Sequence, residues 1–501
     1  MPVTPAEISR NIRAGASSEE TGNRRRSTMA GAIAWLGAAT WATQLTTWAY
    51  MIVVARILTP ADYGLIGMAK IPLEFLTVAT EFGVANAIIM LPDVSQHQIA
   101  QLNTVAVISG VALFGVSCFG AHLLGLFFKT PDLPPVFVAL SLALVITSFR
   151  TIPEALLQRE CRFNLLAKIQ AAQAIVYGST AVISAAMGAR YWSLVIASLL
   201  GVTFGTLLVI RCRSHEFAWP KITSLREILV FSSQVFGRRV AWFYNCNIDF
   251  AVVGRVLGKA ALGSYNLAWL IAEQPQQKFS DLVTRVVPPY FSKVQNDRAA
   301  LRQYLLSISQ AISLVVVPAT VGLALTADDF VAVALGPKWV NAVVPLQLLA
   351  LYSALRSHTS FFAPLLNVTG QSRFVMWNHI WAAVYFTPLL YFATQWGIVG
   401  VAMVWPLLYP VLAVPLYLRA FKQTDLCWAS YWEAVRPAVS SVIPMTIGLL
   451  VLRNVLPLDF GSYARLASEV FTGALLYIVT LVLAHRGALE RVVSTLRPSR
   501  S

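Results

Sequence analysis

Long apolar runs separated by short polar connections dominate the chain. A helix needs about 20 apolar residues to cross a bilayer, and fourteen segments of this kind can be marked in the sequence. They cover residues 30–55, 63–91, 104–128, 134–157, 166–187, 192–211, 227–254, 263–290, 305–327, 340–366, 373–394, 397–419, 434–453 and 464–485. No connection is long enough to fold as a separate aqueous domain. The pattern predicts an all-α polytopic membrane protein with about 14 transmembrane helices.

The composition excludes the soluble classes of protein. Of 501 residues, 57% are hydrophobic and only 12% are charged, whereas an ordinary soluble domain carries about 25% charged residues. The five cysteines form no CxxC pair and the six histidines show no metal-ligand spacing. We therefore expect no disulfide framework, no metal site and no bound cofactor. The net charge of +15 would suggest nucleic acid in a soluble protein, but no such partner is expected here.

Lysine and arginine are distributed unequally between the two sides of the predicted membrane domain. If the N-terminus is cytoplasmic, the cytoplasmic segments hold 23 basic residues and the opposite segments hold eight. The N-terminal tail includes Arg24, Arg25 and Arg26, and the C-terminal tail is basic as well. Because basic residues beside spans favour the cytoplasm, both termini are predicted to be cytoplasmic.

The chain resembles itself when residues 56–64 are aligned with residues 255–263, since Arg, Leu, Ala and Gly then match without a gap. Pro153 corresponds to Pro364 further on. Six spans is an even number, so two parallel six-helix repeats are expected, followed by two C-terminal helices. The predicted divisions are a basic tail 1–29, an N-terminal lobe 30–212, a linker 213–226, a C-terminal lobe 227–421, two extra helices 422–485 and a basic tail 486–501.

Three segments carry a family resemblance: ARILTPADYGLIGMA (residues 55–69), EFGVANAII (81–89) and LLQRECRFNLLA (156–167). They resemble the Wzx-type flippases of bacterial polysaccharide synthesis, in the colanic-acid-type branch of the multidrug/oligosaccharidyl-lipid/polysaccharide exporter superfamily. The resemblance implies transfer of undecaprenyl-diphosphate-linked oligosaccharide units across the bacterial cytoplasmic (inner) membrane. It also implies membrane lipids, a polysaccharide polymerase and a co-polymerase as partners.

Charged residues inside spans are costly to insert, so they are the candidates for function. Lys70, Glu74 and Glu81 fall within one arc of the second span at helical spacing, and Arg238 and Asp249 share a face of the seventh. The candidate substrate-binding residues are Lys70, Arg238, Arg239, Lys278, Arg285, Arg150 and Arg356. The candidates for coupling to a proton or sodium gradient are Glu74, Glu81, Asp249 and Asp281.

Cationic side chains suit a diphosphate because guanidinium and ammonium groups donate charge-assisted hydrogen bonds to its oxygens. The alternative is that these residues form ion pairs between or within helices, such as Glu74 with Arg238 or Arg150 with Glu154. Pro72 and a proline at position 275 add a further hint, since interrupted spans in two halves often mark a transport site.

Two other functions compete with that of a flippase. An ion-coupled small-molecule or drug antiporter of the same fold favours twelve spans and a mainly acidic cavity, whereas the charged stripes here hold a slight basic excess. A membrane enzyme needs acid/base or metal groups at the outer face and a sizeable outer loop, and neither is evident. The chain is therefore expected not to be an enzyme.

Overall fold

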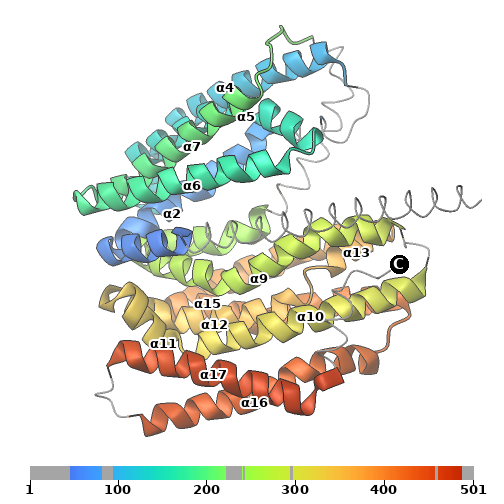
Figure 1. Cartoon of the computed structure of the whole chain (residues 1–501). Coiled ribbons are helices and arrows are strands. Elements are labelled where there is room, and N and C mark those ends of the chain that lie inside the picture. Colours follow the sequence, from blue (N-terminus) through green and yellow to red (C-terminus); the bar gives the residue numbers. More distant parts are fainter. Residues whose placement is uncertain are drawn as a thin grey trace, which may run out of the picture.

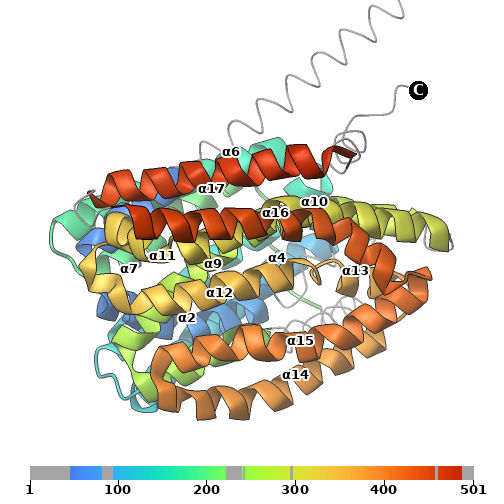
Figure 2. The same ribbon diagram turned by 90° about the horizontal axis from the view of Figure 1, so that it is seen from below.

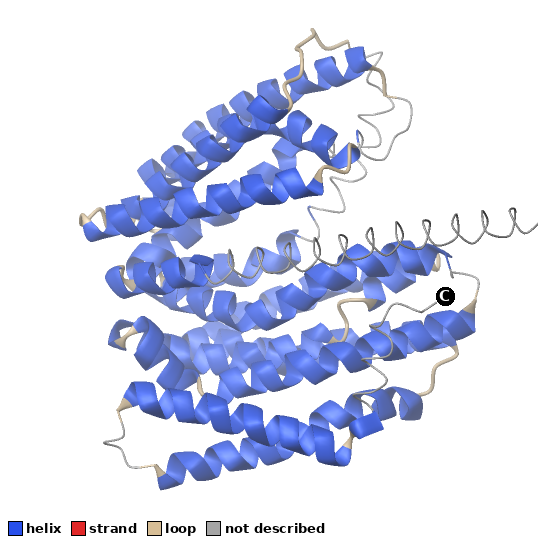
Figure 3. Ribbon diagram, in the orientation of Figure 1, coloured by secondary structure: helices blue, strands red, loops and turns tan. Residues whose placement is uncertain are grey.

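The structure, a computed structural model, describes residues 46–81, 94–221, 243–293, 297–456 and 461–487, together with residues 88 and 240. At residues 78–81 and 278–293 the description covers the backbone alone. Every regular element in these ranges is a helix, and none is a strand (Figure 3). The predicted all-α class is confirmed.

The helices follow the predicted spans along the chain. The first lobe contains the helix Thr46–Ile57, α2 (Pro60–Glu81), α4 (Gln96–Phe128), α5 (Leu133–Arg159), α6 (Phe163–Ala186) and α7 (Trp192–Cys212). The second lobe contains the helix 243–257, α9 (Lys259–Lys293), α10 (Arg298–Leu325), α11 (Ala327–Phe330), η1 (Val331–Leu335), η2 (Pro337–Ala342), α12 (Val343–Ser357), α13 (Phe362–Val368), α14 (Ser372–Ala393), η3 (Thr394–Trp396) and α15 (Gly397–Thr424). The last pair is α16 (Trp428–Val455) and α17 (Ser462–Ala484). Where the predicted spans fall within the described ranges, they consist almost entirely of helix.

Two details differ from the sequence-based expectation. The tenth predicted span, 340–366, is divided into η2, α12 and α13. The mid-span prolines do not interrupt their helices, because α2 continues through Pro72 and α9 continues through Pro275. A proline removes one backbone hydrogen bond and can bend a helix without ending it.

Local signals explain several helix ends. Ser95 and Gln98 form a reciprocal capping box at the start of α4, so two backbone N–H groups are satisfied there. Asp297 accepts hydrogen bonds from the backbone N–H groups of Ala299 and Ala300 at the start of α10. These caps fix the connections that precede the third helix of each lobe.

Within the described ranges, eight helical segments are long and apolar enough to cross a membrane, or nine if Thr46–Ile57 and Pro60–Thr77, which are bent by 120°, form one span. Neither α2 nor α9 passes this test alone. Both carry charged residues, including Lys70 and Glu273, and both pack against protein. The protein is a multi-pass membrane protein whose charged helices lie between the two lobes.

The lobes meet through α2 and α9, which lie side by side between α4–α7 and the rest of the second lobe (Figure 1). Toward the end that holds residues 56–64, 255–263 and 326–339 the lobes converge, and we call this the contact end. Toward the opposite end the helices of the first lobe tilt away from those of the second (Figure 1). The pair α16–α17 packs on α10, on the side of the second lobe away from the first (Figures 1 and 2).

Two glycines of the repeated motif allow the closest approach of the lobes. A Cβ atom at Gly64 would lie 1.6 Å from the carbonyl oxygen of Lys259, and one at Gly263 would lie 1.8 Å from that of Pro60. Only a residue without a side chain fits at either position. The buried apolar core is therefore continuous between the lobes here, including Leu65, Leu262 and others.

Candidate functional site

The two predicted charges of α2 that the structure describes, Lys70 and Glu74, are both exposed in the protein. They are four residues apart and so lie on one face of the helix. Neither makes an ion pair or a hydrogen bond within the described part of the chain. The neighbouring Phe75 contacts Phe243 of the second lobe, with ring centroids 5.5 Å apart. The Phe75 side of α2 is therefore directed toward the second lobe.

Asp249 lies inside the second lobe and is completely buried. Its Oδ2 atom accepts a hydrogen bond of 2.7 Å from the Tyr265 hydroxyl, which in turn accepts one of 3.0 Å from the Trp405 indole N–H. The Oδ1 atom has no hydrogen-bond partner among the described residues. A buried carboxyl group with one free oxygen is costly unless a proton or a cation compensates it.

Arg356 of α12 forms an ion pair with Glu273 of α9. The other carboxylate oxygen of Glu273 accepts hydrogen bonds from the Trp269 indole, at 3.2 Å, and from the Gln277 amide, at 3.0 Å. Tyr352, one turn before Arg356, packs against Trp269 with the rings tilted and their centroids 5.6 Å apart. The pair thus bridges the second and fourth helices of the second lobe beside an aromatic cluster.

Cys246 lies near charged groups of both lobes. Its thiol lies within electrostatic range of Arg356, Asp249 and Glu273 of the second lobe, and of Glu74 of the first. Three predicted residues, Glu74, Asp249 and Arg356, therefore lie around Cys246, with Asp249 inside the second lobe and Glu74 on α2 of the first. The structure adds Glu273, which the sequence analysis did not select because it lies off the face shared by positions 278, 281 and 285.

Arg150 is placed differently from Arg356. It forms an ion pair with Glu154, at 2.6 Å, and donates to the Gln173 side chain at 2.7 Å. Its side chain is only 12% exposed, inside the first lobe. A Cβ atom at Gly205 would lie 3.0 Å from the guanidinium, so this glycine makes room for the cluster. The ion pair is the alternative interpretation that the sequence allowed, and a substrate contact for Arg150 stays a prediction.

The remaining predicted site residues lie outside what the structure describes. Arg238 and Arg239 fall between the described ranges, and only the backbone is described at Glu81, Lys278, Asp281 and Arg285. Their assignment to a substrate or coupling site remains a prediction.

At the contact end the repeated arginines make equivalent contacts with the opposite lobe. Arg56 of the first lobe donates to the carbonyl oxygens of Val333, and of Ala334 at 2.9 Å. Arg255 of the second lobe donates to the carbonyl oxygens of Phe127, and of Leu126 at 3.3 Å, at the end of α4. Each arginine therefore donates to carbonyl groups at the end of a helix or turn of the opposite lobe. The two copies of the duplicated motif therefore make the same kind of contact with the opposite lobe.

Further polar contacts close the contact end. Lys259 and Asp132 form an ion pair of 3.0 Å between the lobes. Lys338 donates to the backbone of Arg56 at 2.9 Å, and the buried Trp339 indole donates to the carbonyl oxygen of Ala55 at 2.9 Å. All of these partners are ends of helices, so a relative movement of the lobes would separate them together.

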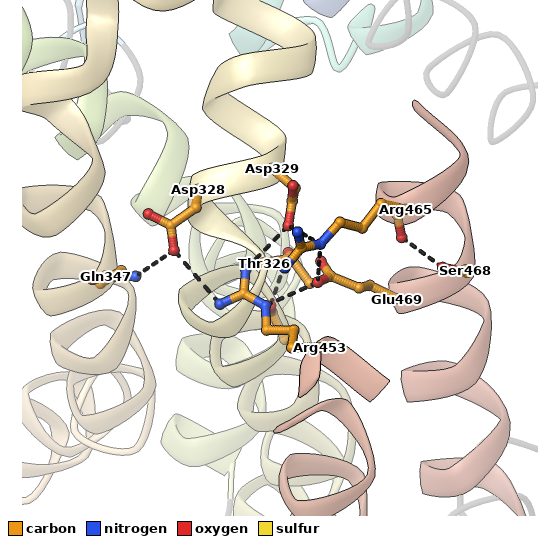
Figure 4. Close-up of polar contacts among 9 residues, drawn as sticks. Thr326, Asp328, Asp329, Gln347, Arg453, Arg465, Ser468 and Glu469 are labelled. Carbon is orange, nitrogen blue, oxygen red and sulfur yellow. Dashed lines mark hydrogen bonds and ion pairs between the residues drawn. The ribbon is translucent and has the colours of Figure 1, made fainter. Parts of the chain in front are cut away.

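A second ionic cluster, which the sequence analysis missed, joins α16 and α17 to α11 (Figure 4). Arg453 donates to Glu469 at 2.8 Å and to Asp329 at 3.3 Å. Arg465 lies 3.4 Å from Asp329. In the sequence the two arginines were counted only as basic residues of the outer side. The i,i+4 spacing of Arg465 and Glu469 was the available signal.

Comparison with known proteins identifies the family. The family model described as "Polysaccharide biosynthesis protein" matches residues 53–344, more than half of the chain. The protein belongs to this family. The predicted resemblance to Wzx-type polysaccharide flippases is thereby confirmed.

Two relatives and one solved structure illustrate the range of similarity. The lipopolysaccharide biosynthesis protein WzxC of Escherichia coli (strain K12) is 27% identical over 364 residues, covering 70% of this chain and 73% of the relative. The teichuronic acid biosynthesis protein TuaB of Bacillus subtilis (strain 168) is 25% identical, covering 82% and 86%. The lipid II flippase MurJ in an inward closed conformation superimposes with a TM-score of 0.75 at 15% identity, over 91% of this chain and 99% of that one. The last likeness shows the fold.

Proposed function

We propose that this protein moves undecaprenyl-diphosphate-linked oligosaccharide units from the inner to the outer leaflet of the bacterial cytoplasmic membrane by alternating access. The family match supports a flippase of polysaccharide biosynthesis, and the relatives' names associate them with lipopolysaccharide and teichuronic acid biosynthesis. In this proposal both termini are cytoplasmic, as the basic residues predict, and the contact end faces outward.

The observation that carries the proposed mechanism is the paired contact of Arg56 and Arg255 with the opposite lobe. Both contacts involve exposed or half-buried side chains and backbone carbonyls, so they can break without leaving a buried charge. Two parallel lobes joined at one end by contacts of this kind form a bistable element. Opening the contact end while the other end closes would carry a bound headgroup from one face to the other.

The charged region between α2 and the second lobe is the proposed substrate site. Lys70 is an exposed cation one helical turn from Glu74, and both Glu74 and the Glu273–Arg356 pair lie within electrostatic range of Cys246. A diphosphate would compete with Glu273 for the Arg356 guanidinium, because phosphate oxygens accept the same charge-assisted hydrogen bonds. The polyprenyl chain would stay in lipid, where its apolar surface is already out of contact with water.

Asp249 is the proposed coupling residue. Its free oxygen and complete burial suit the binding of a proton or a sodium ion from a transmembrane gradient. Binding there would neutralise a charge inside the second lobe and change how its helices pack. Glu74 is a second candidate, since it is exposed between the lobes.

A reconstitution experiment tests the proposal. Purified protein in liposomes that contain a fluorescently labelled, short-chain polyprenyl-diphosphate oligosaccharide should make the inner-leaflet label accessible to an external membrane-impermeant quencher. Arg356→Ala should slow this exchange, whereas Lys422→Ala, a change at the end of α15 away from the lobe interface, should not. Exchange no faster than in protein-free liposomes would refute the flippase.

The antiporter alternative predicts a different result. A cation-coupled exporter of small molecules would move a fluorescent lipophilic cation across the same liposomes and would leave the lipid-linked label in place. The slight basic excess of the predicted charged stripes disfavours that cargo, because like charges repel in a site of low dielectric.

A further inference from the structure

The connection between the third and fourth helices differs greatly between the two lobes. In the first lobe it covers only residues 129–132, between α4 and α5. In the second lobe it covers residues 326–342 and is built mainly from α11, η1 and η2, which have 4, 5 and 6 residues. Helical elements this short are not stable alone, because helix formation repays its initial cost only over several turns. Residues 326–342, which we call the long connection, therefore depend on tertiary contacts for their shape.

One side of the long connection contacts the first lobe. Arg56 donates to two carbonyl groups of η1, and Lys338 and Trp339 donate in turn to the backbone of residues 55–57. The equivalent contact of Arg255 is made with the end of α4, a long regular helix. Intrahelical hydrogen bonds hold the carbonyl groups of such a helix in place. The carbonyl groups that receive Arg56 are positioned only as well as the long connection itself.

Another side of the long connection is held by the ionic cluster of α16 and α17 (Figure 4). Arg453, near the end of α16, donates to Asp329 at 3.3 Å, and Arg465, near the start of α17, lies 3.4 Å from the same carboxylate oxygen. Asp329 is 14% exposed, so these pairs are screened less than pairs at the surface. Arg453 also lies 3.5 Å from Asp328, which is 56% exposed. Asp329 is therefore the main carboxylate through which both arginines reach the long connection.

The last two helices also approach the contact between the lobes directly. At the contact end α11 and η1 pack against α17 (Figure 1). Arg56 of the first lobe donates to the hydroxyl of Tyr463, at the start of α17, at 3.3 Å. The pair α16–α17 lies beyond the two repeats in the sequence and packs on the second lobe, which is the lobe with the long connection. The extra helices thus support the lobe whose connection cannot support itself.

We propose that α16 and α17 position the long connection for its contacts with the first lobe, and that Arg453 and Arg465 do so through Asp329. The two helices thereby stabilise the state in which the contact end is closed. Loss of the Asp329 carboxylate shifts the lobes toward the state in which this end is open. The proposal concerns the arrangement of the lobes, so it holds whichever molecule the protein moves.

Cross-linking of the full-length protein in lipid nanodiscs tests the proposal. Cysteines replace Asp132 and Lys259, an ion pair of 3.0 Å between the lobes, in a background without the five native cysteines. Neither position belongs to the long connection or to α16–α17, so the rate of linkage by a short bifunctional thiol reagent reports closure of the lobes. Asp329→Asn should slow this linkage about fivefold or more. The variant leaves Arg453 paired with Glu469, so the contact between α16 and α17 is kept.

Two matched variants separate positioning from a general weakening of the helix pair. Tyr477→Phe removes a hydrogen bond of 2.7 Å from α17 to the Leu314 carbonyl of α10, outside the ionic cluster. It should lower the melting temperature in detergent and leave the linkage rate unchanged. Asp329→Glu keeps a carboxylate on the long connection and should restore most of the rate that Asp329→Asn loses.

Three results would overturn the proposal. An unchanged linkage rate in Asp329→Asn would show that the cluster stabilises the second lobe without affecting the contact end. Equal slowing by Tyr477→Phe would assign the effect to the packing of α17 on α10. No recovery in Asp329→Glu would show that the carboxylate is not the group that acts. If Asp329→Asn does not reach the membrane, Arg465→Gln takes its place with the same expected slowing, since it too leaves Arg453 paired with Glu469.

Discussion

Replacing Gly64 by alanine perturbs the contact between the lobes with a single methyl group. The added Cβ atom would lie 1.6 Å from the Lys259 carbonyl oxygen and 3.0 Å from the Gly263 backbone nitrogen. Both obstacles are backbone atoms of α9, so no side chain can rotate out of the way. The chain can accommodate the methyl group only by moving α2 away from α9.

The size of that movement follows from the distances. Ordinary contacts of a Cβ atom begin at 3.4 Å, so the helices must separate by roughly 1.8 Å at this point. Forcing one carbon into a packed interface costs about 1–3 kcal/mol. The cost falls on the state in which the lobes touch and is absent when they are apart. The ratio of closed to open contact ends should therefore decrease about 5- to 150-fold.

Chemical cross-linking measures this ratio. Asp132→Cys and Lys259→Cys replace the two partners of an ion pair that spans the lobes at 3.0 Å. In a background without the five native cysteines, a short bifunctional thiol reagent should link this pair readily when Gly64 is present. Gly64→Ala should slow the linkage by the fold-change given above and should favour longer reagents.

The matched control is Gly120→Ala in α4. No atom lies within 4 Å of a Cβ at this helical position, so the same chemical change should leave the cross-linking rate unaltered. Equal rates for Gly64→Ala and Gly120→Ala would refute the argument that the bare backbone contact closes this end. Gly263→Ala, whose Cβ would meet the Pro60 carbonyl at 1.8 Å, should repeat the effect of Gly64→Ala.

Three further predictions concern charged residues. Arg56→Ala and Arg255→Ala should each reduce cross-linking between positions 132 and 259 by less than about tenfold, because each variant loses exposed or half-buried hydrogen bonds worth about 1 kcal/mol. Unequal effects of the two variants would contradict the equivalence of the repeats. Glu273→Gln should lower the melting temperature in detergent, because it leaves the half-buried Arg356 without its partner. Adding Arg356→Gln should restore much of this loss, whereas additive losses would show that the pair is not coupled. Arg238→Ala combined with Lys278→Ala should abolish polymer export at normal membrane levels of the protein, with lipid-linked units accumulating in the inner leaflet; normal export would remove both residues from the proposed site.

The fold could be predicted because its signals are local and repetitive. Apolar length marks the spans, and the repeated Arg and Gly positions of residues 56–64 and 255–263 indicate the duplication. The structure explains why these positions stayed alike. The glycines meet the backbone of the opposite lobe, and the arginines bind the ends of its third helix or the turn that follows it. A contact between two copies of one motif constrains both copies equally.

The candidate site was only partly predictable, because helical spacing gives the face of a residue and not its partner. Lys70 and Glu74 share one face of α2, and the Cys246 thiol of the second lobe lies within electrostatic range of Glu74. The ion pair of Glu273 with Arg356 joins residues 83 positions apart, and the pair of Arg453 with Asp329 joins residues 124 apart. Such pairings depend on how helices are arranged in space, which spacing along one helix does not reveal.

The two arginines of the fourth helices show how the duplicated lobes have diverged. Arg150 is closed inside the first lobe by Glu154, on its own helix, and by Gln173 of α6. Arg356 instead reaches Glu273 of α9, the helix that contacts the first lobe, and its side chain is 28% exposed compared with 12% for Arg150. A guanidinium held only by its own lobe stabilises that lobe, whereas one held at the lobe interface can exchange its carboxylate for another anion when the lobes move. The second lobe, with Asp249 and the Glu273–Arg356 pair, is therefore the half of this transporter in which charge recognition and coupling are expected to reside.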